Sequence, residues 1–318
     1  MRPCRFPPPL KPGDLLCAIA PSGALREQTA FQQGVEIWQA RGYQVDIMAG
    51  YDDRWGYLAG TDEARCQQLA MALANPDYRA ILCVRGGWGG ARLLETWQAT
   101  RGDLTLSNPN LSDPNLSNPN LSNPKWLVGF SDITSLLWAW SLEGISGVHG
   151  PLLTTIGQEP GWSLLHLFDL LEGRSLEPIH GKGWGGGSAT GLLLPANLTV
   201  ATHLLSTPYQ PDFQGVILAL EDVGEAPYRI DRMLTQWRMT GALQQVAGIA
   251  LGRFSLCDAP SHIPSFSVEE VLRDRLGDLG IPIVADLPFG HEGVNIALPL
   301  GVPVTLDGNR GTLRFSAA

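Results

Sequence analysis

The feature that most constrains the fold is the alternation of apolar, strand-like runs with helical segments in the first half of the chain. Leu15–Ala20 and Ala80–Val84 are uninterrupted apolar runs, which is typical of strands covered on both faces. Between them, Phe31, Val35 and Trp38 recur at the spacing of one helical face. This alternation predicts an α/β domain with a parallel sheet, which binds ligands beyond the carboxyl ends of its strands.

The length of 318 residues is enough for two domains. We predict an N-terminal domain over residues 1–155, a linker over 156–188 and a C-terminal domain over 189–318. Within the linker, His180–Ser188 is rich in glycine and predicts a flexible connection. The second half combines strand-like runs with an amphipathic segment at Tyr228–Met239, which predicts a mixed α and β domain.

Composition excludes several classes of protein. Hydrophobic residues make up 44% of the chain and charged residues 17%, which is typical of a globular protein. A net charge of −9 disfavours nucleic acid as a partner. No apolar stretch approaches the roughly eighteen residues of a membrane helix, and the N-terminus lacks the apolar core of a secretory signal. With five scattered cysteines and no Cys-x-x-Cys pair, the sequence predicts a cytoplasmic protein with reduced thiols and no membrane partner.

A low-complexity repeat, Leu106–Lys125, interrupts the first domain. It consists of four pentads: L-S-N-P-N, L-S-D-P-N, L-S-N-P-N and L-S-N-P-K. Each proline follows Asn or Asp, which disfavours both a helix and an interior strand. One leucine per pentad is too few to bury a core, so we predict an inserted surface loop. A stacked-turn structure with a five-residue period is the alternative.

The segment Trp126–Trp140 joins a short apolar run to an apolar segment of one helix length through G-F-S-D. A strand that turns sharply into a helix over Gly-x-Ser exposes the serine hydroxyl, and N–H groups at the helix start can stabilise an oxyanion. This outline predicts a nucleophile elbow at Ser131, although Ile133 replaces the last glycine of G-x-S-x-G. The alternative is that Ser131 or Asp132 only caps the helix.

A glycine cluster, R-G-G-W-G-G at Arg85–Gly90, follows the second apolar run. Backbone N–H groups in such a loop can bind a phosphate or an oxyanion. The spacing is not G-x-G-x-x-G, and no acidic residue is placed for a ribose, so a dinucleotide is weakly supported. A tight strand-to-helix turn without a ligand is the alternative.

A serine nucleophile needs a general base and a carboxylate that orients the base. Of six histidines, His291 and His149 lie in comparable places, and spacing does not choose between them. Glu221 ends the apolar run G-V-I-L-A-L, which would hold its carboxylate in a fixed, partly buried position. Its alternative role is a cap or an ion pair with Arg229 or Arg232. No cluster of ligand-type side chains has metal spacing, so we expect neither a metal nor another cofactor.

Five motifs, in order, make the chain resemble the LD-carboxypeptidases, serine peptidases that remove terminal D-alanine from murein tetrapeptides. The motifs are R-G-G-W-G-G-A-R-L-L, L-V-G-F-S-D-I-T, V-H-G-P-L, L-E-D-V-G-E-A-P-Y-R-I-D-R-M-L and G-H-E-G-V-N-I-A-L-P-L-G. The resemblance runs from about Gly13 to Gly301. It implies a catalytic triad with Ser131 as nucleophile, Glu221 as acid and His291 as base.

The resemblance also implies a fold. An α/β domain with a flavodoxin- or amidotransferase-like parallel sheet would precede a swivelling β/β/α domain, and homodimers are common in the family. Two features depart from the family pattern. The pentad repeat is particular to this chain, and Leu194–Thr199 resembles the G-G-N-L of the family but replaces both glycines.

We therefore expect a cytoplasmic serine carboxypeptidase that cleaves the L,D-peptide bond before the terminal D-alanine of a murein tetrapeptide. The oxyanion-hole candidates are the N–H groups of Asp132 and Gly87, with Gly86 beside them. A terminal carboxylate needs a cation or an N–H-rich pocket, which Arg85 could supply.

Two other functions stay open. Immunity-type relatives hydrolyse an acyl-sulfamoyl adenylate antibiotic of the microcin C kind, and Trp184 could stack on its adenine. The alternative for Trp184 is packing at the domain junction. A protein of a different class would bind a small anion at R-G-G-W-G-G without catalysis.

Overall fold

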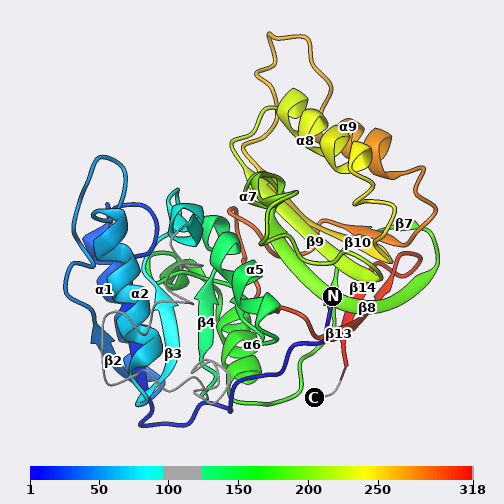
Figure 1. Cartoon of the computed structure of the whole chain (residues 1–318). Helices are drawn as coiled ribbons and strands as arrows, with labels where there is room; N and C mark the ends of the chain where they lie inside the picture. Colours follow the sequence, from blue (N-terminus) through cyan, green and yellow to red (C-terminus); the bar gives the residue numbers. More distant parts are fainter. Residues whose placement is uncertain (96–122, 317–318) are drawn as a thin grey trace. The chain divides into compact units, whose positions relative to one another are not determined.

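The computed structural model describes residues 1–95 and 123–316 (Figure 1). The chain forms two compact units. The N-terminal unit contains residues 4–158 and 171–173, and the C-terminal unit contains the rest. In neither described stretch does a helix have the length and apolar character needed to cross a membrane.

The N-terminal unit is built on a parallel sheet, within which its strands lie in the order β5-β4-β3-β1-β2. Residues of β1, β3 and β4 are almost all buried, so both faces of the sheet are covered. The predicted parallel α/β domain is confirmed. The strands are β1 (Leu15–Ile19), β2 (Gln44–Ile47), β3 (Tyr78–Cys83), β4 (Trp126–Gly129) and β5 (Val148–His149).

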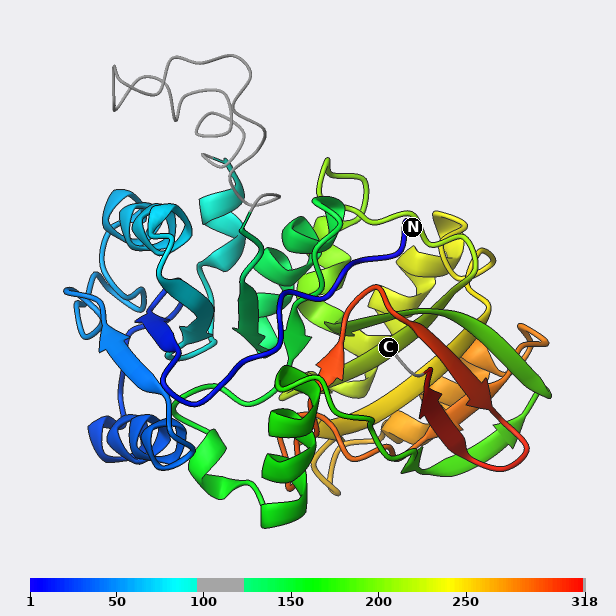
Figure 2. The same cartoon turned by 90° about the horizontal axis from the view of Figure 1, so that it is seen from below.

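Helices α1 (Gln28–Ala40) and α2 (Asp62–Ala74) cover opposite faces of this sheet (Figure 2). In the sheet, β2 lies on one side of β1 and β3 lies on the other, so the connections β1–β2 and β2–β3 run in opposite directions across the sheet. Right-handed crossovers therefore place the two helices on opposite faces. The strand order reverses between β1 and β3, so the loops after these strands lie at the topological switch point, where open α/β sheets bind ligands.

The C-terminal unit contains an eight-stranded mixed sheet with the strand order β6-β14-β13-β8-β9-β10-β11-β7. The central strands are parallel: β8 (Ser188–Asn197), β9 (Val216–Val223), β10 (Gly248–Ser255) and β11 (Ile283–Ala285). The flanking strands pair antiparallel. They are β6 (Ile179–His180), β7 (Lys182–Gly185), β13 (Pro303–Asp307) and β14 (Thr312–Phe315), and β12 (Leu298–Pro299) is a further short strand.

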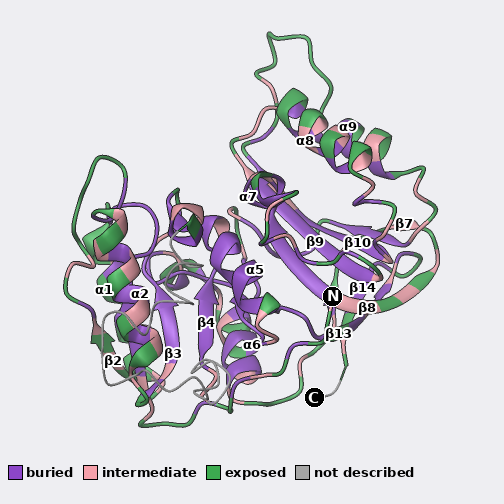
Figure 3. Ribbon diagram, viewed as in Figure 1, coloured by how far each residue is buried: buried purple, intermediate pink, exposed green. Residues whose placement is uncertain are grey.

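Helices α8 and α9 lie side by side on one face of this sheet, with their exposed residues turned away from it (Figure 3). α8 buries Ile230, Leu234 and Trp237, which confirms the predicted amphipathic segment. A proline begins α8, and a capping box begins α9. The helices are α6 (Gly161–Leu171, with residues 161–170 in this unit), α7 (Leu198–Leu204), α8 (Pro227–Met239) and α9 (Val268–Leu276).

The glycine-rich segment His180–Ser188 is not the flexible connection that we predicted. Its strand β7 pairs antiparallel with β11. A Cβ atom at Gly183 would lie 2.2 Å from the carbonyl oxygen of Gly308, and one at Gly186 would lie 2.1 Å from that of Ile281. At Gly183 and Gly186 glycine is required because backbone packs directly on backbone, and Gly185 and Gly187 have the positive φ that glycine adopts at little cost. The predicted linker also contains α6.

Most of the pentad repeat, from 106 to 122, lies outside the described residues. At its end, Nδ2 of Asn123 donates to the carbonyl oxygen of Pro76 at 3.0 Å. Lys125 is only 3% exposed, and its Nζ donates to the carbonyl oxygen of Leu73 at 2.8 Å. The prediction of a surface loop is therefore wrong for Lys125, where the chain enters β4.

His166 is a buried residue of α6. Its Nε2 lies 3.1 Å from the carbonyl oxygen of Ala297, and its ring lies 5.4 Å from the ring of Phe315. Burial lowers the pKa of His166 from the ordinary 6.5 to about 4. The folded protein therefore keeps this ring neutral at pH values at which the unfolded chain protonates it.

We expect acid to destabilise the protein partly through His166. The pKa of His166 is lower in the folded protein than in the unfolded chain. Its contribution to the free energy of unfolding is therefore complete above about pH 6.5 and is lost as the pH falls towards about 4. The loss amounts to up to about 3 kcal/mol. Urea unfolding between these pH values should show a shallower loss of stability in His166→Gln than in the wild type. His180→Gln, at an exposed histidine, should keep the wild-type slope. Equal slopes for the wild type and His166→Gln would contradict the prediction.

Candidate active site

Ser131 lies at the turn between β4 and helix α5 (Thr134–Leu142). It begins a short 3-10 helix, η1 (Ser131–Ile133), whose N-cap is Phe130. Its φ of 63° lies in the left-handed region, which residues other than glycine rarely adopt. A strained serine between a strand and a helix is the backbone geometry that a nucleophile elbow requires. Neither Ser131 nor Asp132 is the N-cap of η1 or α5, so the capping alternative is not supported.

Two glycines allow close packing around Ser131. A Cβ atom at Gly86 would lie 3.0 Å from Cβ and 3.1 Å from Oγ of Ser131. The loop after β3 therefore lies directly against the serine side chain. A Cβ atom at Gly129 would lie 3.0 Å from Cγ1 of Ile133 and 3.1 Å from Cβ of Cys83. The glycine of G-F-S-D thus lets the start of the helix pack closely on the sheet.

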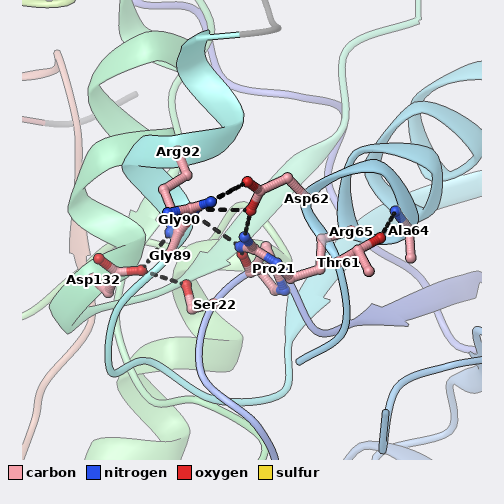
Figure 4. Close-up of polar contacts among 10 residues, drawn as sticks. All are labelled: Pro21, Ser22, Thr61, Asp62, Ala64, Arg65, Gly89, Gly90, Arg92 and Asp132. Carbon is pink, nitrogen blue, oxygen red and sulfur yellow. Dashed lines mark hydrogen bonds and ion pairs between the residues drawn. The ribbon is translucent and has the colours of Figure 1, made fainter. Parts of the chain in front are cut away.

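The side chain of Asp132 joins two neighbouring loops (Figure 4). The residue is fully buried, and its Oδ2 accepts hydrogen bonds from Oγ of Ser22 at 2.6 Å and from the N–H of Gly90 at 2.7 Å. Ser22 follows β1, and Gly90 begins a helical stretch after β3. Asp132 therefore connects the serine turn to both loops at the switch point. Sequence reasoning considered Asp132 for its backbone N–H and as a possible helix cap, and missed its contact with Ser22.

Arg85 and Gly87 lie in the same loop as Gly86. A Cβ atom at Gly23 would lie 2.3 Å from Nη1 of Arg85, so the guanidinium lies against the turn after β1. Burial, and then the charge of Arg26, lower the pKa of Arg85. An arginine nevertheless stays charged at neutral pH. Gly87 has a φ of 104°, which glycine adopts at little cost. The switch point therefore combines a cation with a glycine turn beside Ser131.

In the C-terminal unit, the structure brings Glu221 and His291 together. Nδ1 of His291 lies 2.7 Å from Oε2 of Glu221. Glu221 is fully buried near the end of β9, whereas the side chain of His291, in the loop after β11, is 18% exposed. A buried carboxylate on Nδ1 is the arrangement that orients the histidine base of a triad. Ser131 belongs to the N-terminal unit.

Asn197 and Asp222 extend this contact, and sequence reasoning missed both. Nδ2 of Asn197 lies 3.3 Å from Oε1 of Glu221 and donates to Oδ1 of Asp222 at 3.0 Å. Parallel pairing of β8 with β9 places Asn197 beside Glu221. Oδ2 of Asp222 accepts hydrogen bonds from the N–H and Oγ1 of Thr199. Burial raises the pKa of Asp222 to about 6. The sequence feature that could have pointed to Asn197 is Asn197-Leu198, which matches the last two residues of the family's G-G-N-L.

A further buried carboxylate, Glu159, shapes the loop that carries His291. Both its oxygens lie 3.1 Å from the N–H of Asn295, and Oε2 accepts a hydrogen bond from Oγ of Ser163 at 2.7 Å. Oδ1 of Asn295 in turn accepts from the N–H of Gly290, the residue before His291, at 3.1 Å. Burial raises the pKa of Glu159. No motif pointed to Glu159 in the sequence.

The structure distinguishes the two candidate histidines. His149 is fully buried on β5, and the centroids of its ring and of the Phe130 ring lie 5.8 Å apart in an edge-to-face arrangement. It is part of the packed interior of the N-terminal unit, whereas His291 contacts a carboxylate. Arg229, which we considered as an ion-pair partner of Glu221, instead lies 3.4 Å from Glu225.

Trp184 lies in β7 and lines a cavity of about 470 Å³ within the C-terminal unit. Cζ of Arg273 lies 4.1 Å from the centroid of the indole ring, which is a cation–π contact. The lining also includes Glu292, the residue after His291. One face of the Trp184 ring is therefore covered by a guanidinium.

Two family descriptions match most of the chain. The LD-carboxypeptidase N-terminal domain matches residues 17–150, and the LD-carboxypeptidase C-terminal domain matches residues 190–306. The chain is 55% identical over 309 residues to a Synechocystis protein named "Putative carboxypeptidase slr1534", covering 97% of this chain and 96% of that protein. It is 32% identical over 308 residues to the murein tetrapeptide carboxypeptidase of Pseudomonas aeruginosa, with 92% of each covered.

Two solved structures have a similar fold. The muramoyltetrapeptide carboxypeptidase of Oxalobacter formigenes has a TM-score of 0.78 and 28% identity, covering 94% of this chain and 97% of that one. MccF in complex with glutamyl sulfamoyl guanosine has a TM-score of 0.82 and covers 98% of each chain. Its identity is only 21%, so that likeness concerns the fold alone. The predicted fold class, a parallel-sheet α/β domain followed by a second sheet domain, is confirmed.

The strain at Ser131 can be measured against a matched serine. Ser206 is exposed and has the same φ of 63°. Relief of left-handed strain is worth roughly 1–2 kcal/mol, and the extra freedom of glycine in the unfolded chain costs roughly 0.5–1 kcal/mol. Ser131→Gly and Ser206→Gly should therefore each raise the free energy of unfolding, by roughly 0.5 kcal/mol. Urea unfolding would show this, and a clear loss of stability in Ser131→Gly alone would mean that its side chain is structural.

Proposed function

Because the chain belongs to the LD-carboxypeptidase family of peptidases, we propose that it is a serine carboxypeptidase that removes terminal D-alanine from a murein tetrapeptide. The observation that carries this proposal is the 2.7 Å contact between the buried Glu221 and His291. Such a carboxylate fixes the imidazole tautomer and stabilises the imidazolium that forms during catalysis. The strained backbone of Ser131 adds support.

In the proposed reaction, Nε2 of His291 takes the hydroxyl proton of Ser131 as Oγ attacks the carbonyl carbon of the L,D-peptide bond. Glu221 stabilises the imidazolium of His291 by accepting a hydrogen bond from its Nδ1–H. The N–H groups of Gly87 and Asp132 bind the oxyanion of the tetrahedral intermediate. When this intermediate collapses, the C–N bond breaks and His291 gives the proton to the amine of D-alanine. Water, deprotonated by His291, then hydrolyses the acyl ester and restores Ser131.

Arg85 is the proposed binding group for the D-alanine carboxylate. Among the residues that the structure describes, no carboxylate forms an ion pair with it. Its pKa is lowered by burial and by Arg26, so a bound carboxylate would offset an unfavourable environment. A guanidinium can also bind a carboxylate through two parallel hydrogen bonds. Arg85 is one residue from Gly86, whose position against Ser131 keeps this cation near the serine turn.

Hydrolysis of an acyl-sulfamoyl adenylate is the second candidate. The microcin C7 self-immunity protein MccF of Escherichia coli is 24% identical to this chain over 338 residues. In that reading Trp184 would stack on the adenine. The guanidinium of Arg273, 4.1 Å from the ring centroid, covers one face of the indole. An adenine could stack on that face only if Arg273 moved away, and otherwise only on the opposite face. The tetrapeptide is therefore the better supported substrate.

Ser131→Ala should lower kcat by several orders of magnitude while the melting temperature stays close to that of the wild type. The measurement is D-alanine release from L-Ala-γ-D-Glu-meso-diaminopimelate-D-Ala. Ser206→Ala, at an exposed serine with the same backbone angle, is the matched control and should keep full activity. A fluorophosphonate probe should label the wild type and Ser206→Ala but not Ser131→Ala.

Wild-type turnover by Ser131→Ala would refute the serine mechanism. Absence of both labelling and turnover in the wild type would favour the third candidate, a non-catalytic protein that binds a small anion.

A parallel assay on an aminoacyl-sulfamoyl adenosine distinguishes the two substrates. We expect fast release of D-alanine and slow cleavage of the adenylate. Trp184→Ala should leave tetrapeptide turnover within about twofold of the wild type, because Trp184 packs against Arg273 within its own unit. Fast adenylate cleavage without tetrapeptide cleavage, reduced a hundredfold in Trp184→Ala, would overturn the choice of substrate.

We also propose that the protein is a cytoplasmic homodimer. The family resemblance supports the dimer. All five cysteines lie in the described part of the chain and none forms a disulfide, which supports a reducing compartment. Sedimentation velocity at micromolar concentration tests the dimer, and a single monomeric species would contradict it.

A further inference from the structure

Arg65, on α2, is a fully buried cation beside the glycine loop (Figure 4). Its Nη1 donates hydrogen bonds to the carbonyl oxygens of Pro21 and Gly89, the latter at 2.8 Å. Pro21 lies in the loop after β1, and Gly89 lies in the loop after β3. One side chain therefore holds both loops that meet at the switch point, through their backbone carbonyls.

Asp132 holds the same two loops through the residues that come next. It accepts from Oγ of Ser22, which follows Pro21, and from the N–H of Gly90, which follows Gly89. The peptide unit between Gly89 and Gly90 is thus fixed at both ends, with its C=O on a buried cation and its N–H on a buried carboxylate. Charge-assisted hydrogen bonds of this kind are roughly twice as strong as neutral ones. We call Arg65 and Asp132 together the loop clamp.

The last two glycines of R-G-G-W-G-G are explained by the loop clamp. A Cβ atom at Gly89 would lie 2.7 Å from Nη1 of Arg65, and Gly89 has a φ of 132°. A Cβ atom at Gly90 would lie 3.0 Å from Oδ2 of Asp132 and 2.5 Å from Oγ of Ser135. Any side chain at these positions would push the loop away from the charged groups. Gly86, in contrast, makes room for Ser131.

A carboxylate outside the clamp forms an ion pair with Arg65. Asp62, three residues earlier on α2, forms ion pairs with both Arg65 and Arg92. Hydrogen bonding from Arg92, together with the charge of Arg65, holds the pKa of Asp62 below its ordinary value. Arg92 lies in the helical stretch that begins at Gly90, so this ion pair also ties that stretch to α2. A carboxylate partner of this kind makes a fully buried arginine tolerable.

We propose that Arg65 and Asp132 are positioning residues, which fix the loop 85–90 against the serine turn so that its N–H groups stay aligned on the oxyanion. The inference rests on the proposed hydrolytic function. Its basis is geometric: Gly86, against Ser131, and Gly89, on Arg65, are only three residues apart in one loop. A displacement of about 1 Å in such a site can cost on the order of a hundredfold in rate.

Ser22→Ala is the most informative test, because it removes one hydrogen bond to Asp132 and leaves both buried charges in place. We expect kcat for D-alanine release to fall roughly tenfold while KM stays within about twofold, since the lost alignment matters in the transition state. Hydrogen–deuterium exchange at the amides of residues 86–90 should become roughly tenfold faster than in the wild type. This readout does not require catalysis.

Ser141→Ala is the matched control. Ser141 is also a buried serine of the N-terminal unit, and its Oγ donates one hydrogen bond, to the carbonyl oxygen of Trp138 at 2.8 Å. Both variants should lose stability, and Ser22→Ala should lose more, because its hydrogen bond goes to a buried carboxylate and that of Ser141 goes to a neutral carbonyl. Only Ser22→Ala should lose kcat and accelerate exchange in the loop. A kcat within twofold of the wild type in Ser22→Ala, or equal effects in both variants, would overturn the proposal.

The exchange measurement distinguishes failure of the clamp from failure of the proposed function. If the wild type hydrolyses neither substrate, the proposed function fails, and faster loop exchange in Ser22→Ala alone still supports the clamp. Arg65→Lys provides a second variant, because an ammonium retains the charge but lacks the planar fork of the guanidinium. We expect its loop exchange to be accelerated as well. Wild-type exchange in both Ser22→Ala and Arg65→Lys would refute the clamp whatever the activity.

Discussion

The buried carboxylate of Asp132 is the interaction on which the N-terminal site depends. Removing a carboxylate from water costs several kcal/mol unless donors replace the lost solvation. Its two donors belong to Ser22, after β1, and Gly90, after β3, while Asp132 itself follows β4. Both hydrogen bonds form only when three loops from three strands are in place together. The hydrogen bonds that make the buried carboxylate tolerable therefore also fix the position of the serine turn.

The C-terminal unit repeats this device with two other carboxylates. Glu221 contacts Asn197, at the end of β8, and His291, in the loop after β11. Glu159 is satisfied by Ser163 and by the backbone N–H of Asn295 in the histidine loop. In each case a buried acid holds polar groups from separate segments of the chain together. Loops at the ends of parallel strands need this help, because hydrophobic burial fixes the strands and not the turns that follow them.

Much of the fold could be predicted from the sequence, because buried strands and amphipathic helices leave local patterns. The strand-to-helix turn at Ser131 and the amphipathic α8 are examples. Positioning contacts leave no such pattern. Arg65 looks like an ordinary helix-surface residue, and only the tertiary fold shows that α2 turns it inward onto two loops. Glu159 was missed for the same reason. The glycines of His180–Ser188 were misread because glycine permits both flexibility and close backbone packing, and composition does not distinguish them.

The strain at Ser131 persists because its surroundings are more costly to disturb than the strain itself. A left-handed serine costs roughly 1–2 kcal/mol, a modest share of the 5–15 kcal/mol typical of a folded domain. On either side, β4 and α5 are anchored by fully buried apolar residues, including Leu127, Leu137 and Trp138. Each such side chain contributes roughly 1.5–3 kcal/mol by burial. Relaxing the turn would mean shifting several of them at once. The core therefore determines the conformation of the serine, and the polar contacts around it determine which groups face it.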